Sequence, residues 1–234
     1  MNAIVRNIPN SVTCMNLIAG CLAIYCATKG ADALWGLKGW EWAAIFIGIG
    51  AVADFLDGFC ARLLKAYSDL GKELDSLCDL VSFGVAPALM LIYLLPSCGM
   101  PQLMAMFTIL IPVAAAVRLA RFNIDTRQAS CFIGLPVPAN AIFWIGFCGL
   151  ANQGAAFLLI PVIFFIILLF ECWLMLSPLK LFSLKFRNYR LKENLSRYIL
   201  IAGAVVLVFC MGVGGLLWLI VFYLLLSLTF KTDV

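Results

Sequence analysis

The sequence predicts an all-α integral membrane protein with about eight membrane-spanning helices. Of its 234 residues, 65% are hydrophobic and only 12% are charged, and the mean hydropathy is +1.07. Apolar runs follow one another along the chain, many of them approaching the roughly 20 residues that a bilayer crossing requires. Lys and Arg gather in alternate connections between these runs, as is typical of multi-pass membrane proteins.

The first half of the chain contains four expected spans. Residues 9–11, Pro-Asn-Ser, offer a helix start, because proline fits a helix entry and Asn or Ser can cap it. These residues and Asn16 argue against a cleaved signal sequence, so we expect the segment to be retained as a span. Trp35, Trp40 and Trp42 border the next loop, as in an interfacial aromatic belt. The four spans are expected over residues 12–27, 41–65, 73–95 and 102–122.

Four more spans are expected in the second half. A polar connection closes with GLPVP, in which Pro136 and Pro138 shape the entry to the fifth span. The last apolar block, residues 198–230, is too long for one crossing, and the glycine-rich sequence at 212–215 is expected to break it in two. The expected spans are residues 139–151, residues 155–176 and the two parts of 198–230.

The distribution of cations predicts the orientation in the membrane. Fourteen of the 16 Lys and Arg residues fall on the side of the two termini, and only Lys29 and Lys38 fall on the other. By the positive-inside rule, both termini and the acidic segment described next should face the cytoplasm, in a cell inner membrane. The net charge of +4 follows this topology and requires no nucleic acid partner.

Cysteine and histidine content excludes several kinds of chemistry. The chain has ten cysteines, most of them isolated in apolar runs, and no histidine. Structural zinc and a disulfide framework are therefore not expected, and the cysteines act as small buried hydrophobic residues. Without histidine, any catalytic base has to be a carboxylate, and any metal has to be held by oxygen atoms.

Half of the 12 acidic residues lie in residues 54–79. Asp54 and Asp57 are three apart and Asp75 and Asp79 four apart, so each pair shares one face of its helix. Carboxylates in a membrane helix are costly and indicate function by default, although charges at helix ends without chemistry are the alternative. The four aspartates predict a cation site on two successive helices.

The chemistry of this segment suits a lipid diphosphate. Carboxylate oxygens favour Mg²⁺ or Mn²⁺, and two such ions can clamp both oxygens of a phosphoryl transfer. Arg62 can bind phosphate with a fork of hydrogen bonds, Gly58 leaves room for a bulky ligand, and Gly71 allows close packing. Asp54 lies about 12 Å deeper along an ideal helix than Arg62, within the membrane but short of its midplane. The residues alone predict a metal-dependent enzyme.

The pattern Asp54-x2-Asp57-Gly58-x2-Ala61-Arg62-x8-Gly71-x3-Asp75-x3-Asp79 resembles the signature of the CDP-alcohol phosphatidyltransferases. The segments IPNSVTCMN, LDSLCDLVSFGVAPA, RLARFN and FIGLPVPAN resemble the membrane-integrated phosphatidylserine synthases of bacteria and archaea, over most of residues 1–145. The resemblance implies a six-helix catalytic core at residues 1–176. A basic cytoplasmic loop at 177–197 and two additional helices at 198–234 would follow.

The resemblance also implies a reaction, in which the phosphatidyl group of CDP-diacylglycerol passes to the hydroxyl of L-serine by direct displacement and CMP is released. It implies a homodimer and two divalent ions, with Asp79 also the candidate base. The implied metal ligands are Asp54, Asp57, Asp75 and Asp79. The implied CDP-diacylglycerol-binding residues are Asn10, Thr13, Gly58, Arg62 and Ser68.

The acceptor side is expected at RLARFN, where Arg118, Arg121 and Phe122 would bind serine. The alternative is that both arginines only anchor the helix at the headgroups. Other members of the family use glycerol phosphate or an inositol phosphate as acceptor, and RLARFN excludes neither. A cation transporter is the alternative from another class, but the acids lie near one side and their pattern is not repeated, as inverted repeats would require.

Overall fold

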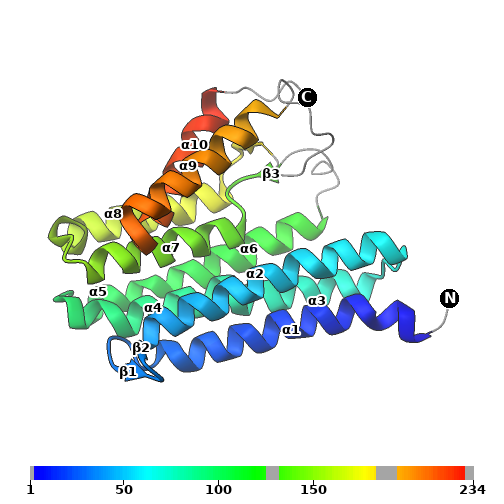
Figure 1. The fold of residues 1–234 in the computed structure, drawn as a ribbon, viewed down its shortest axis with the longest axis horizontal. Helices are drawn as coiled ribbons and strands as arrows, with labels where there is room; N and C mark the ends of the chain where they lie inside the picture. Colours follow the sequence, from blue (N-terminus) through cyan, green and yellow to red (C-terminus); the bar gives the residue numbers. More distant parts are fainter. Residues whose placement is uncertain (1–2, 125–131, 183–193, 230–234) are drawn as a thin grey trace.

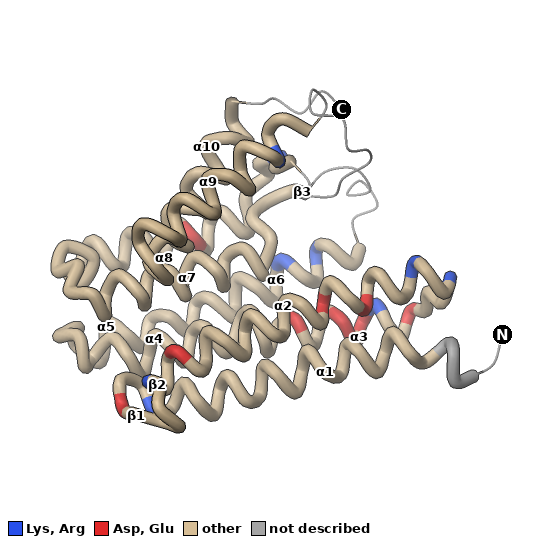
Figure 2. Tube along the Cα trace, viewed as in Figure 1, with Lys and Arg blue, Asp and Glu red and all other residues tan. Residues whose placement is uncertain are grey.

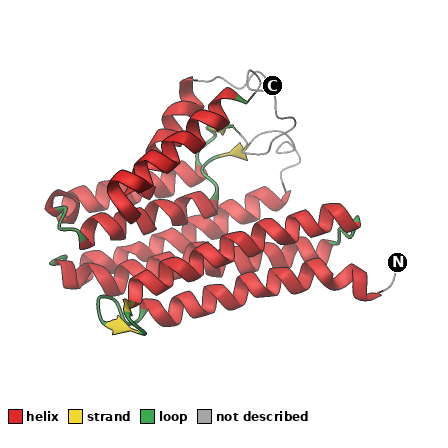
Figure 3. Cartoon of the chain, viewed as in Figure 1, coloured by secondary structure: helices red, strands yellow, loops and turns green. Residues whose placement is uncertain are grey.

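A computed structural model describes residues 3–124, 132–182 and 194–229 and consists almost entirely of helices packed side by side (Figures 1 and 3). Five helical stretches in this part of the chain are long and apolar enough to cross a membrane, and two shorter helices are also apolar. The structure therefore confirms the predicted all-α, multi-pass membrane protein. Residue 127, residues 183–193 of the basic loop and residue 231, which entered the charge argument, lie outside the described residues.

The first two helices run antiparallel along one side of the bundle (Figure 1). α1 (Ala3–Ala27) and α2 (Gly39–Leu64) are joined by a small hairpin of β1 (Ala33–Leu34) and β2 (Leu37–Lys38). Trp35 at this turn is 68% exposed, as the aromatic belt predicted, but Trp40 is only 3% exposed. Trp40 therefore packs in the core and is not part of the belt.

The predicted helix start at residues 9–11 is wrong. α1 begins at Ala3, so Pro9 lies inside the helix and does not open it. A proline removes one backbone donor, and hydroxyl side chains in the same turn can bond to the carbonyls nearby. Here Ser11 donates to the Asn7 carbonyl at 3.1 Å and Thr13 to the Pro9 carbonyl at 3.0 Å. The helix continues through the proline, and both hydroxyls bond to carbonyls of the preceding turn.

The third and fourth rods are each built from consecutive helical segments. The third spans Asp69–Cys98 without a break. It comprises α3 (Asp69–Asp79), a π-helix η1 (Leu80–Val85), α4 (Ala86–Leu94) and a 3₁₀ helix η2 (Leu95–Cys98). The fourth comprises α5 (Gln102–Met106), a 3₁₀ turn η3 (Phe107–Ile109) and α6 (Leu110–Ile124). Both match the predicted spans, but the π-helix was not predicted.

The next two helices are connected back to the bundle by a short ribbon. α7 (Val137–Asn152) begins at the predicted prolines, and α8 (Pro161–Leu176) follows a 3₁₀ turn η4 (Ala156–Leu159). β3 (Phe132–Ile133) pairs antiparallel with β4 (Lys180–Leu181), which lies within the predicted basic loop. This pairing holds the start of α7 beside the end of α8.

The C-terminal apolar block folds into a helical hairpin. α9 (Leu195–Met211) and α10 (Gly215–Thr229) are separated by a 3₁₀ turn η6 (Gly212–Gly214), as the glycine-rich sequence predicted. Gly212 has φ +57°, a conformation that favours glycine. The two helices pack closely at Gly203, where an added Cβ would lie only 2.6 Å from the Phe222 ring. Each helix is shorter than the about 20 residues of a full crossing, so the count of eight spans stays a prediction.

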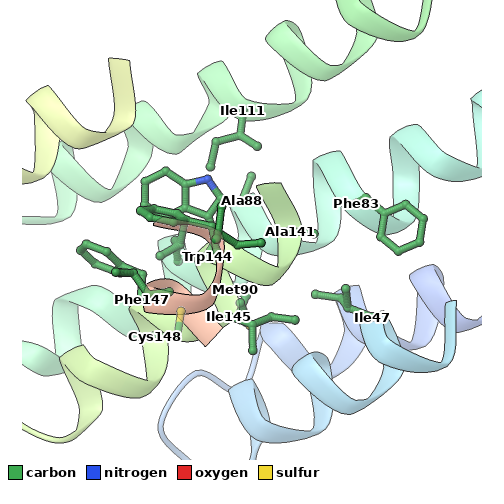
Figure 4. Close-up of a cluster of buried hydrophobic side chains, with 14 of the residues drawn as sticks. Ile47, Phe83, Ala88, Met90, Ile111, Ala141, Trp144, Ile145, Phe147 and Cys148 are labelled. Atoms are coloured by element: carbon green, nitrogen blue, oxygen red, sulfur yellow. The ribbon is translucent and has the colours of Figure 1, made fainter. Parts of the chain in front are cut away.

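The hydrophobic core lies between α2, α4, α6 and α7 and is centred on aromatic residues of α7 (Figure 4). Trp144 and Phe147 are fully buried, and their ring centroids lie 5.4 Å apart. The Trp144 indole donates a hydrogen bond to Asn140 Oδ1 at 3.0 Å. This polar contact satisfies the ring nitrogen inside an apolar core. The core thus packs α7 against α2, the helix that carries Asp54 and Asp57.

The hairpin docks on α7 through a glycine contact. A Cβ at Gly146 would overlap the backbone of Leu216 and Leu217 at the start of α10. Small residues allow such close helix approach in membrane proteins. We expect Gly146→Ala to lower the thermal unfolding midpoint in detergent by several degrees, because overpacking costs about 1–3 kcal/mol. Gly48→Ala is the control, since its Cβ position has nothing within 4 Å, and an equal midpoint in both variants would contradict the contact.

Candidate functional site

Three carboxylates from two helices meet at one end of the bundle. Asp54 and Asp57 on α2 and Asp75 on α3 each offer an oxygen, and these oxygens all lie within 4.8 Å of one another. Asp57 Oδ2 and Asp75 Oδ1 are buried and have no hydrogen-bond partner in the described part of the chain. Buried unpaired charges of like sign are costly unless a cation compensates them. The arrangement therefore fits a divalent metal, whose preferred ligands are carboxylate oxygens.

A sharp turn brings these two helices together. α2 ends at Leu64, and the next residue, Lys65, adopts the left-handed conformation at φ 50°. α3 begins after Ser68, whose hydroxyl accepts a hydrogen bond from the Gly71 amide at 3.0 Å. This is a helix N-cap, which fixes where the helix starts. In Figure 2 the acids of this region lie at the same end of the bundle as several basic residues.

Asp79 lies one helical turn further along α3 and is held by α1. The Asn16 side-chain amide donates to Asp79 Oδ1 at 3.0 Å, and both residues are buried. Asp79 interacts electrostatically with all three clustered aspartates, although it does not belong to their 4.8 Å group. The Ser82 hydroxyl donates to the Asn16 carbonyl at 3.0 Å, from the π-helix that begins directly after Asp79. π-helical turns often occur at functional sites.

The residues predicted to bind CDP-diacylglycerol surround the cluster on three helices. Thr13 is buried beside the Asp57 carboxylate, and its hydroxyl donates to the Pro9 carbonyl at 3.0 Å. The Cβ position of Gly71 lies 2.9 Å from Asn10 Oδ1 and 3.0 Å from Ser68 Oγ. A side chain at position 71 would therefore displace Asn10 and Ser68, two of the residues predicted to bind CDP-diacylglycerol.

Two further predicted residues lie on the exposed side of α2. Arg62 is exposed, and its Nη1 lies 3.7 Å from the Cβ position of Gly58, with no other contact there within 4 Å. The space above Gly58 is therefore open to a ligand. Arg62 lies at the edge of this space.

On the acceptor side, the structure separates the two predicted arginines. Arg118 is 7% exposed, its Nε has no hydrogen-bond partner among the described residues, and its guanidinium lies 5.9 Å from the Phe122 ring centroid. It interacts electrostatically with Asp79. Arg121 is exposed and donates to the Leu176 carbonyl at 3.4 Å. Arg118 and Phe122 are therefore brought to the site, whereas Arg121 faces α8.

The sequence analysis missed two asparagines that organise the site. Asn16 orients Asp79, as described above. Asn123 joins α6 to α3, because its side chain bonds to Ser76 Oγ at 3.0 Å and its carbonyl accepts from Lys72 Nζ at 2.5 Å. Both asparagines were visible as polar residues within or beside apolar runs, a pattern that indicates function in membrane helices.

Comparisons with known proteins agree with the family resemblance of the sequence motif. The family model described as CDP-alcohol phosphatidyltransferase matches residues 6–180. The chain is similar to the CDP-diacylglycerol–serine O-phosphatidyltransferase of Methanocaldococcus jannaschii, with 40% identity over 146 residues, 62% of this chain and 62% of that protein. It is 38% identical over 131 residues to the protein of that name from Bacillus subtilis, covering 56% and 69%.

A third relative is less fully covered. The chain is 36% identical over 156 residues to the CDP-diacylglycerol–serine O-phosphatidyltransferase of Mycobacterium leprae, covering 64% of this chain and 49% of that protein. The alignments thus extend over about half to two thirds of the lengths of these relatives.

Proposed function

The chain belongs to the CDP-alcohol phosphatidyltransferase family, and from this premise we propose that it is a phosphatidylserine synthase. It transfers the phosphatidyl group of CDP-diacylglycerol to the hydroxyl of L-serine and releases CMP, the activity that the names of its relatives describe. The observation that carries the proposal is the juxtaposition of two groups. Asp54, Asp57 and Asp75 cluster near Asp79, and one buried oxygen each of Asp57 and Asp75 has no hydrogen-bond partner among the described residues. The buried Arg118 is the cation that interacts with Asp79.

Asp54, Asp57 and Asp75 would hold the divalent ions, Mg²⁺ or Mn²⁺ and two in number by the resemblance. When bound, such ions neutralise the charge of a diphosphate and of the group that leaves it. The unpartnered oxygens of Asp57 and Asp75 support this assignment. The resemblance also implies Asp79 as a fourth ligand, but Asp79 lies outside the 4.8 Å group, so we propose the role of base for it.

The CDP-diacylglycerol is bound between α1, α2 and α3. Arg62 reaches a phosphate from the exposed edge of α2, and the open space above Gly58 admits the nucleotide. Asn10, Thr13 and Ser68 offer polar atoms from the facing helices. The acyl chains extend from this position into the lipid, which suits a site within the membrane.

Serine binds with its carboxylate on Arg118, beside the ring of Phe122. A buried guanidinium with a free Nε–H favours a planar carboxylate partner. Asp79 takes the proton from the serine hydroxyl. The hydroxyl oxygen then forms a bond to the lipid-side phosphorus, and the bond from that phosphorus to the CMP oxygen breaks. Asn16 keeps the Asp79 carboxylate turned for this transfer.

The membrane setting supports an active site that faces the cytoplasm of a cell inner membrane. Lys and Arg residues gather at the end of the bundle that carries the acids (Figure 2), and the positive-inside rule assigns that end to the cytoplasm. Both termini would lie on this side. The homodimer stays a prediction.

The acceptor is tested by competition. Purified protein receives CDP-diacylglycerol with Mg²⁺ or Mn²⁺ and equal concentrations of L-serine, glycerol 3-phosphate and an inositol phosphate. The lipid product is then identified by mass spectrometry. Phosphatidylserine is the expected product, and a phosphate-bearing lipid would overturn the assignment of serine while keeping the family chemistry.

We expect Asn16→Ala to lower kcat about 10- to 100-fold, the effect of removing a residue that orients a first ligand or base. The variant leaves Asp79 buried without its amide donor. CMP release at saturating substrates measures the effect. Ser11→Ala on the same helix is the control, since its hydroxyl donates to the Asn7 carbonyl at an exposed position. Equal rates for Asn16→Ala and wild type would remove Asn16 from the mechanism.

A further inference from the structure

The amide of Asn16 lies in a confined space between α1, α2 and the third rod. The residue is fully buried, and its amide nitrogen donates to Asp79 Oδ1 at 3.0 Å. Its amide oxygen is also buried and has no hydrogen-bond partner among the described residues. A hydrogen bond therefore fixes only one end of this side chain, and the packing around the oxygen has to fix the other.

The amide oxygen of Asn16 lies against a glycine of α2. Gly50 is buried and stands one helical turn before Asp54. A Cβ at position 50 would lie 2.9 Å from Asn16 Oδ1, whereas ordinary van der Waals contacts begin at about 3.4 Å. The next nearest atom, Ser82 Cβ at 3.6 Å, would be an ordinary contact. A side chain at this position would therefore push the amide of Asn16 away by about half an ångström.

The main chain of Asn16 is held from the π-helix η1. The Ser82 hydroxyl donates to the Asn16 carbonyl at 3.0 Å. One turn further along α1, a Cβ at Gly20 would overlap Ser82 Oγ, so α1 and η1 are already in close contact. The apolar core continues at this level with Ile47 and Phe83, which are almost fully buried (Figure 4). Pressure from residue 50 is therefore relieved most easily by turning the Asn16 side chain.

We propose that Gly50 is a positioning residue for Asp79 and acts through Asn16. By leaving room for the amide oxygen, Gly50 lets the amide nitrogen face the carboxylate that takes the proton of the serine hydroxyl. The inference rests on the proposed function, in which Asp79 is the base. Gly50 has no side chain that could bind a substrate, and the proposed ligands of the two substrates include Arg62 and Arg118. Substrate affinity should therefore not depend on Gly50.

The test is Gly50→Ala in the full-length protein. We expect kcat for CMP release to fall about 10- to 100-fold, as in Asn16→Ala, because a small misplacement of a catalytic group causes losses of this size. The KM values for serine and CDP-diacylglycerol and the affinity for Mn²⁺ should stay within about twofold of wild type. The thermal midpoint should stay within about two degrees, since the displaced atom is the end of a side chain and alanine favours a helix.

Gly48→Ala is the matched control on the same helix. It adds the same methyl group at a Cβ position that has nothing within 4 Å, so its kcat should match wild type. Wild-type kcat in Gly50→Ala would overturn the inference. A Gly50→Ala protein that does not fold, or in which both KM values rise while the midpoint falls, would make Gly50 a packing residue only and would overturn the inference too.

The double variant Asn16→Ala/Gly50→Ala separates positioning from packing. Without the amide, a methyl group at position 50 has nothing to displace, so kcat of the double variant should equal that of Asn16→Ala alone. A further loss of kcat in the double variant would mean that Gly50 acts by another route and would contradict the inference. A wild-type protein without serine-dependent CMP release would overturn the proposed function first.

Discussion

Asp57→Asn is expected to abolish turnover, with a loss of at least about a thousandfold. Bound ions contribute several kcal/mol to the stabilisation of developing charge, and each 1.36 kcal/mol corresponds to a factor of about ten in rate. Asp57 is buried, and its Oδ2 has no hydrogen-bond partner in the described residues. Asparagine keeps the shape but removes the charge and one ligand oxygen. The rate of CMP release and the affinity for Mn²⁺ are the measurements.

The control for this prediction is Asp69→Asn in the same segment. Asp69 is exposed in the first turn of α3, outside the cluster of carboxylates, so the rate should remain close to wild type. The metal-free Asp57→Asn protein should also melt at a higher temperature than metal-free wild type, because one of three neighbouring like charges is gone. Wild-type turnover by Asp57→Asn, or a lower midpoint with unchanged Mn²⁺ affinity, would contradict the metal site.

Asp79→Asn is expected to lower kcat by about 10²- to 10⁴-fold, the usual contribution of a general base. Asp79 accepts the Asn16 amide and lies outside the 4.8 Å group of carboxylates. Mn²⁺ affinity is therefore expected to be retained in this variant and lost in Asp57→Asn. Kinetics at saturating substrates, combined with Mn²⁺ binding, separate the two roles.

Two outcomes would change this assignment. If Asp79→Asn loses Mn²⁺ binding as fully as Asp57→Asn does, Asp79 acts as a ligand, as the family resemblance implied. If Asp79→Asn retains the full rate, another residue acts as the general base. Asp69→Asn again serves as the matched control, because it is an exposed acid on the same helix.

Much of the fold could be predicted because the apolar interior and the thickness of the bilayer set the hydropathy and the length of each helix. The break at 212–215 was predicted because glycines end an apolar run that is too long for one span. The spacing of Asp54 and Asp57 predicted that they share one face of their helix, since residues three apart are neighbours on a helix. These features are local, and a sequence records them directly.

The features that sequence reasoning missed depend on contacts between distant segments. The hydrogen bond from Asn16 to Asp79 joins residues 63 apart, and the one from Tyr223 to Phe182 joins residues 41 apart. No local pattern encodes either of them. The β3–β4 ribbon is two residues long on each side, too short to produce an alternating pattern. Pro9 led to a wrong helix start because proline is common in the first turn of a helix, whereas here the helix runs through it.

One buried acid stands outside every predicted motif. Glu171 on α8 is 2% exposed, and its Oε2 has no hydrogen-bond partner in the described part of the chain. It could have been noticed as the lone charge in the apolar run of residues 161–176. Its distance from the aspartate segment in the sequence kept it out of the site prediction.

The most direct test of the account is the metal dependence of CMP release from CDP-diacylglycerol by the purified wild-type protein. The account predicts release that requires both L-serine and Mg²⁺ or Mn²⁺, stops with EDTA and returns when the metal is restored in excess. Release that continues at the same rate in EDTA would contradict the role assigned to the three clustered aspartates. No release with any acceptor or either metal, from protein that melts cooperatively, would contradict the proposed activity.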